Sequence, residues 1–124
     1  MMLKDLADYL QAKGYGTKGT DLFYGHQPDS PPACITLFEF GGDGPDQVLN
    51  LETPGLQVNV RDPDYAAGRE TAGAILEELH TLWETGINGT RYLYIKATGT
   101  PIPLGRNKAG QFEFTVNFTV VKER

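Results

Sequence analysis

The sequence predicts an α+β fold, a two-layer sandwich in which two helices pack on one face of a mostly antiparallel or mixed sheet of about five strands. Two stretches carry apolar residues at helical spacing, residues 3–13 and 63–86. Shorter stretches have the alternation or the β-branched and aromatic content of strands. Because two helices cannot cover both sheet faces, we expect two layers. With 124 residues and 40% hydrophobic content, a single domain over residues 1–124 is expected.

The first third of the chain predicts one helix followed by two strands. The helix over residues 3–13 ends at Gly14, a residue suited to the left-handed stop. Residues 21–25 have strand composition, and residues 33–40 are apolar almost throughout, as in a strand covered on both faces. Between them, residues 26–32 contain three prolines. Since proline lacks a backbone donor, this segment is predicted to be a surface connection.

The middle of the chain predicts a projecting loop and the strand that leads into the long helix. Residues 41–47 contain three glycines, a proline and two acids, a composition typical of a mobile polar loop outside the core. Residues 48–53 then lead toward the next strand, and Pro54 and Gly55 predict a turn immediately before it. Residues 56–60 alternate apolar and polar side chains, which predicts a half-buried strand.

The long helix has predicted boundaries at both ends. Asp62 is a good N-cap, and Pro63 is favourable at the first helical position, where no backbone donor is needed. Gly86 predicts the C-terminal stop. A helix of about 22 residues would be roughly 33 Å long, enough to cross a small sheet from edge to edge.

The C-terminal third predicts mostly strands. Asn88 and Gly89 predict a turn, and residues 91–98 a strand. Residues 100–104 hold two prolines and predict an extended rim. Residues 111–120 alternate without a break between apolar and polar side chains. A strand of that length either pairs centrally or extends beyond the sheet.

Charge and composition argue against several classes of partner. Sixteen acidic against eleven basic residues give a net charge of -5, which argues against a protein whose main task is to neutralise phosphate backbones, so nucleic acid is not expected as a direct partner. The N-terminus becomes charged too early for a signal peptide, and no apolar run approaches the roughly 18 residues that span a bilayer, so no membrane partner is expected. The single cysteine, Cys34, cannot form an internal disulfide and indicates a reducing compartment.

No catalytic, cofactor-binding or metal-binding residue is predicted, and we expect no enzyme. His26 lies in a predicted loop and His80 in the long helix, and neither has a recognisable nucleophile nearby in sequence. These histidines and Cys34 lack paired metal-ligand spacing, and Asp43 and Asp46 lack the alternation of a calcium loop. The glycine-rich loop that holds these two acids has no Gly-Lys-Ser/Thr ending, so it predicts no phosphate site.

The order and spacing of several short segments indicate a family resemblance that covers nearly the whole chain. The segments are residues 23–25 with 28–32, 41–42, 54–61, 65–67, 91–95 and 101–106, and the alternating final strand. In this order they resemble the minor capsid or tail-terminator proteins of long-tailed bacteriophages.

The resemblance implies a small α+β structural subunit of the virion, assembled in the host cytoplasm, with no catalytic residues to carry over. It implies a homo-oligomeric ring, commonly a hexamer, that terminates the tail tube and mediates head-tail joining. The implied partners are further copies of the chain, the tail-tube protein and a head connector or head-completion protein. Genome DNA would pass through such a ring without sequence-specific contact.

Three segments are the candidate assembly contacts: the glycine loop over residues 41–47, the proline rim extended to residues 100–107, and the last strand. Their residues are Gly41, Gly42, Asp43, Gly44, Asp46, Pro101, Pro103, Arg106, Phe112 and Phe114. The loop and the rim are expected to contact the tube or the connector. The last strand is expected to form one side of a ring contact, and one of the two helices part of the other side.

Two alternative functions remain open. The first is a head-completion or connector subunit of a phage, which would have a similar size and fold. The second is a small-molecule-binding accessory domain, which would use the sheet face away from the helices as an apolar pocket. Phe38, Phe40, Tyr92 and Tyr94 are the residues expected on that face.

Overall fold

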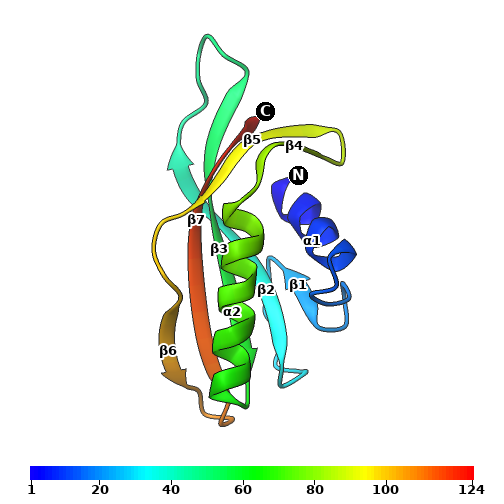
Figure 1. Ribbon diagram of the computed structural model, residues 1–124, viewed down its shortest axis with the longest axis vertical. Helices are drawn as coiled ribbons and strands as arrows, with labels where there is room; N and C mark the ends of the chain where they lie inside the picture. The colour runs from blue at the N-terminus through cyan, green and yellow to red at the C-terminus, as the bar shows by residue number, and fades with distance from the viewer.

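The computed structural model describes all 124 residues and contains two helices and one seven-stranded sheet (Figure 1). The elements are α1 (Met2–Ala12), β1 (Leu22–Tyr24), β2 (Cys34–Asp43), β3 (Leu51–Asp62), α2 (Tyr65–His80), β4 (Trp83–Ile87), β5 (Thr90–Ala97), β6 (Ile102–Arg106) and β7 (Phe112–Glu123). The strand order is β1-β2-β3-β7-β5-β4, and β6 pairs with the first part of β7. Strands β1 and β2 are parallel, and the other pairs are antiparallel.

The predicted α+β class, with two helices and a mixed sheet, is confirmed, but the prediction of a two-layer sandwich with about five strands is wrong in strand number and in packing. The two additional strands are β4 and β6, in segments assigned from sequence to the helix end and the rim. The sheet also curls into a half-barrel. Two central strands of 12 residues each accumulate twist, and register shifts against β2, β5 and β6 bend the sheet further.

The core lies between the helices and one face of the sheet. In β7 the alternation predicted over residues 111–120 is confirmed, because the side chains at even positions from 114 to 120 are fully buried. β7 also pairs with β3 on one edge and with β5 and β6 on the other, so it is a central strand. Fully buried members of the core include Phe114, Val116, Phe118 and Val120 of β7, Leu56 and Val58 of β3, and Ala72, Ile75 and Leu79 of α2.

The long helix is shorter than its sequence pattern predicts. Helix α2 has 16 residues, with Asp64 as the N-cap residue, whereas Asp62 ends β3 and its carboxylate accepts a hydrogen bond from the backbone N of Asp64 at 2.8 Å. The helix ends at His80, and Gly86 lies in β4. Pairing of β4 with β5 replaces the last helical turn, and Trp83 is consequently 73% exposed although its spacing predicts burial.

The turn predicted at Pro54 and Gly55 is also wrong, because both residues lie within β3. The strand predicted over residues 56–60 therefore starts earlier, at Leu51, and runs through both residues. Pro54 falls opposite the register shift between Phe40 and Asp43 of β2, where a missing backbone donor disturbs the ladder least.

The turn predicted at Asn88 and Gly89 is confirmed. It joins β4 to β5 as a two-residue hairpin loop closed by the pair Ile87 and Thr90. Both turn residues have positive φ, 51° for Asn88 and 82° for Gly89. Asparagine followed by glycine adopts this type I′ geometry readily, so the local sequence alone determines the turn.

Two glycines of α2 give a matched test of the helix packing. A Cβ on Gly68 would lie 2.8 Å from the buried ring of Phe114 and 3.1 Å from Asp62 Cβ, whereas a Cβ on Gly73 would meet only the flexible end of Arg69. We expect Gly68→Ala to lower the free energy of unfolding by about 1–3 kcal/mol through overpacking. Gly73→Ala should raise it by up to about 1 kcal/mol through helix propensity. Urea denaturation checks both, and equal effects would contradict the packing described here.

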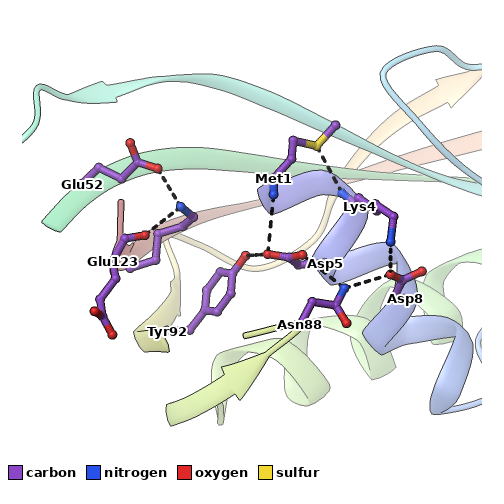
Figure 2. Close-up of polar contacts among 9 residues, drawn as sticks. Met1, Lys4, Asp5, Asp8, Glu52, Asn88, Tyr92 and Glu123 are labelled. Atoms are coloured by element: carbon purple, nitrogen blue, oxygen red, sulfur yellow. Dashed lines mark hydrogen bonds and ion pairs between the residues drawn. The ribbon is translucent and has the colours of Figure 1, made fainter. Parts of the chain in front are cut away.

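Helix α1 is attached to the rest of the fold by polar contacts as well as by its apolar stripe (Figure 2). The carboxylate of Asp5 accepts hydrogen bonds from Tyr92 Oη at 2.8 Å and from Asn88 Nδ2 at 3.2 Å. Tyr9 Oη donates to Glu78 Oε2 of α2 at 2.8 Å. Burial, together with this hydrogen bond, raises the pKa of Tyr9 to about 12. These contacts join α1 to β5, to the β4–β5 turn and to α2.

Asp8 predicts an acid-sensitive contribution to stability. Its carboxylate accepts hydrogen bonds from Lys18, from Lys4 Nζ at 2.9 Å and from Asn88 Nδ2 at 2.9 Å. These contacts, with Lys18 first, hold the pKa of Asp8 well below its usual range. The ionised Asp8 carboxylate therefore stabilises the fold above about pH 4, the usual pKa range of a carboxyl group. This stabilisation is lost as the pH falls toward the lower pKa that Asp8 has in the folded protein.

Since the Asp8 side chain is partly solvated, we expect this contribution to be under about 1 kcal/mol. Asp8→Asn should lower the urea midpoint at pH 7 and have a smaller effect at pH 2.5. An equal loss at both pH values would show that the charge is not responsible.

Candidate assembly surfaces

The most prominent surface feature is a hairpin that projects past the rest of the sheet (Figure 1). We call it the arm and define it as residues 39–53, the far ends of β2 and β3 with the loop between them. The prediction of a loop beginning at Gly41 is wrong, because Gly41, Gly42 and Asp43 are the last residues of β2. Asp43 pairs with Thr53, and this pairing with β3 extends the strand through the glycines.

The tip of the arm is closed by its own hydrogen bonds and exposes apolar side chains. Asp46 Oδ1 accepts from the backbone N of Val48 at 2.8 Å and of Leu49 at 2.7 Å, and these two bonds lower the pKa of Asp46. Val48 is 90% exposed, Leu49 57% and Phe40 48%. Gly44 is exposed in the same tip. Three exposed apolar side chains on one narrow hairpin are typical of a contact surface.

The predicted rim is an edge strand, β6. Its five residues are all exposed, including Pro103, Arg106, Ile102 at 47% and Leu104 at 59%. Pro101, immediately before the strand, is buried. β6 pairs with β7 alone, so its other edge is open to solvent. Within the predicted contact segment 100–107, the sequence prediction names Pro101, Pro103 and Arg106 and does not single out Ile102 and Leu104, although apolar residues alternating with prolines are a visible signal of an exposed strand.

The two candidate contact residues of β7, Phe112 and Phe114, lie beneath the start of α2. Phe114 is fully buried, with its ring centroid 5.0 Å from that of Tyr65 in an edge-to-face arrangement. Phe112 is half-buried, 5.3 Å from the same ring, and the Arg106 guanidinium lies 5.9 Å from its centroid. Phe114 therefore offers no surface in the single chain, while Phe112 offers part of its side chain.

The sheet face opposite the helices is polar near its centre. Asn59 and Arg61 are 8% and 5% exposed there. Gln27 Nε2 donates to Glu113 Oε1 at 3.1 Å, Asn59 Nδ2 donates to the same oxygen at 3.2 Å, and Arg61 donates to the carbonyl of Pro31 at 2.7 Å. The proline-rich connection before β2 thus covers this face, which confirms its predicted surface position.

The expected apolar patch on that face is only partly formed. Tyr92 is on the helix side and fully buried beneath α1. Phe38 is half-buried, and Phe40 belongs to the arm. Tyr94 is 41% exposed and pairs with Trp83 of the edge strand β4, in the segment that the helical spacing of residues 63–86 assigns to the long helix. The apolar pocket on which a small-molecule function would depend is therefore not assembled from these residues.

The residues with potential for chemistry are dispersed. Cys34 lines a pocket of about 130 Å³ with Arg61 and Asp62, and burial raises the pKa of its thiol. His80 Nδ1 accepts a hydrogen bond from the backbone N of Ala97 at 3.0 Å and so connects the end of α2 to β5. His26 is exposed. No three His, Cys, Asp or Glu side chains are grouped to hold a metal ion. Neither helix is long and apolar enough to cross a membrane.

Comparison with known proteins identifies the class to which this fold and these surfaces belong. Residues 9–124 match the family model described as bacteriophage tail terminator protein. A chain of the virion of a native gene transfer agent particle has a similar fold, with a TM-score of 0.66 and 16% identity over 82% of this chain and 78% of that chain. A second solved structure has a TM-score of 0.47 at 16% identity over 98% of this chain and 89% of its own, too low to support an argument. No curated protein matches the sequence.

The class is therefore that of structural proteins of phage tails. Because the family model covers almost the whole chain, the protein belongs to the bacteriophage tail terminator family. The predicted resemblance to tail-terminator proteins is confirmed.

Proposed function

We propose that this protein assembles into a hexameric ring that caps the phage tail tube and presents a surface to the head connector. The observation that carries the proposal is the match to the tail terminator family over residues 9–124. The fold shared with a chain of a gene transfer agent virion supports a place in the virion particle. In this proposal the partners are further copies of the chain, the tail-tube protein and a head-side protein.

The surfaces of the single chain support closed assembly. A ring requires a heterologous contact, in which one surface of a subunit meets a different surface of its neighbour. The arm and the open edges of β4 and β6 are different surfaces that the chain leaves unused. Strand edges and exposed apolar side chains are features that subunit contacts cover.

The test is assembly with and without tail tubes. We expect native mass spectrometry and negative-stain microscopy to show rings of six copies, and purified tail tubes to carry one such ring at an end. A chain that remains monomeric at every concentration, alone and with tubes, would contradict the proposal. Co-purification with the portal complex in place of the tube would instead indicate a head-completion or connector subunit.

A glycine pair in the arm tests whether the arm takes part in assembly. A Cβ on Gly42 would overlap the backbone carbonyl of Thr53, whereas a Cβ on Gly41 would meet nothing within 4 Å. Gly42→Ala should therefore disturb the arm and reduce attachment to tubes or neighbours at least about tenfold, a loss of about 1.4 kcal/mol. Gly41→Ala should attach as the wild type does. Because the arm lies outside the core, the thermal unfolding temperature should be nearly unchanged in both variants. If both variants attach equally well, the arm takes no part in the assembly contact.

A further inference from the structure

Charge is divided unevenly between two segments of the chain. The arm contains four acidic residues and no lysine or arginine: Glu39, Asp43, Asp46 and Glu52. Residues 96–110, which we call the basic segment, run from the end of β5 through β6 into the next turn. This segment contains three basic residues and no acidic one: Lys96, Arg106 and Lys108. The two segments are therefore opposite in charge.

Most of these charges have no ion-pair partner within the chain. Glu52 pairs with Lys122 Nζ at 2.7 Å, on the side of the arm that faces β7. The other three acids of the arm and the three bases of the basic segment form no ion pair and are exposed. Unpaired charges of opposite sign are available for contact with another molecule.

The tip of the arm and the end of the basic segment that holds Arg106 and Lys108 cannot meet within one chain. The tip of the arm and the turn that follows β6 lie at opposite ends of the long axis (Figure 1). Each also exposes apolar side chains, Val48 and Leu49 on the arm and Ile102 and Leu104 on β6. Each has an open strand edge, because β2 beyond Leu37 pairs with β3 alone and β6 pairs with β7 alone.

We propose that the arm of one copy docks along β6 of the next copy, with the acids of the arm against the bases of the basic segment. This contact presupposes the ring proposed above, and the arm and β6 are the two surfaces that meet in it. A second copy is the occupant because the two segments match in charge and in apolar content. They are also different surfaces, so the contact is heterologous and repeats from copy to copy.

Charge reversal tests the contact. The arm variant is Glu39→Lys with Asp43→Lys, the β6 variant is Arg106→Glu with Lys108→Glu, and a third variant combines all four changes. Matched reversals at exposed positions outside both segments, Asp29→Lys and Arg69→Glu, are the controls. Sedimentation velocity and native mass spectrometry measure the protein concentration at which half of the rings dissociate, in low and high NaCl.

Each double reversal should raise that concentration at least about tenfold, because like charges then face each other. The variant that combines all four changes should recover most of the lost ring stability. The controls should behave as the wild type, and high salt should weaken the wild-type ring. The docking is overturned if either reversal leaves the ring intact, if the combination gives no recovery, or if the controls dissociate equally. If the wild type still forms rings in those cases, the proposed ring function is retained and only the docking contact is rejected. If the wild type is monomeric with and without tubes, the ring function and the docking contact are both rejected.

Discussion

Replacing Phe114 by alanine is expected to lower the free energy of unfolding by about 3–5 kcal/mol. Phe114 is fully buried between β7 and α2, with the Tyr65 ring 5.0 Å away and the backbone of Gly68 close to its edge. Removing the ring loses its buried apolar area and leaves a cavity that the helix cannot readily fill, because the long central strands fix the sheet below.

Equilibrium denaturation in urea measures this effect. Phe40→Ala is the matched control, because the Phe40 ring is 48% exposed on the arm. That change should stay within about 0.5 kcal/mol of the wild type. A loss below about 1 kcal/mol for Phe114→Ala would contradict the packing of α2 on β7.

Replacing Tyr92 by phenylalanine is expected to cost about 2–3 kcal/mol, although it removes a single oxygen atom. Tyr92 is fully buried and its hydroxyl donates to Asp5, whose side chain is 5% exposed. Without this donor the buried carboxylate keeps a hydrogen bond from Asn88 at 3.2 Å and an ion pair with the N-terminal amine at 3.9 Å. Hydrogen bonds to charged groups contribute more than neutral ones, and a buried charge left short of partners is costly.

A double-mutant cycle separates this bond from other effects of the substitution. Asp5→Ala leaves the Tyr92 hydroxyl without its acceptor, so the two single changes should be strongly non-additive, by about 1 kcal/mol or more. Additive effects would show that the hydroxyl and the carboxylate do not interact in solution.

The pH dependence gives a second readout for Tyr92. Burial, together with Asp5, raises the pKa of Tyr92 above its usual value. Wild-type stability should therefore decrease as the pH rises above about 10, the usual phenol range, and Tyr92→Phe should lack this contribution.

The sequence predicts the local conformation correctly where a single local requirement decides it. The alternation over residues 111–120 predicted β7, because a central strand with one buried face requires that period. Asn88 and Gly89 predicted a two-residue turn, because both accept positive φ.

The errors lie where pairing partners distant in sequence decide the conformation. The helical period continues past His80, but residues 83–87 pair with β5 and become a strand. Pro54 and Gly55 are turn residues by composition, yet β3 continues through them because β2 and β7 lie on its two sides. The same long pairing converts Gly41 and Gly42 from a loop into the base of the arm.

The sequence by itself determined the α+β class, the buried face of β7, the two helices and the family resemblance, since these depend on the order of residues along the chain. Only the tertiary structure decided which candidate contacts are surfaces. It buries Phe114 and Pro101 and leaves the arm and β6 exposed. Exposure depends on which strands pair and how the sheet curls. Those choices are made by contacts between distant segments, whose free energies no local pattern contains.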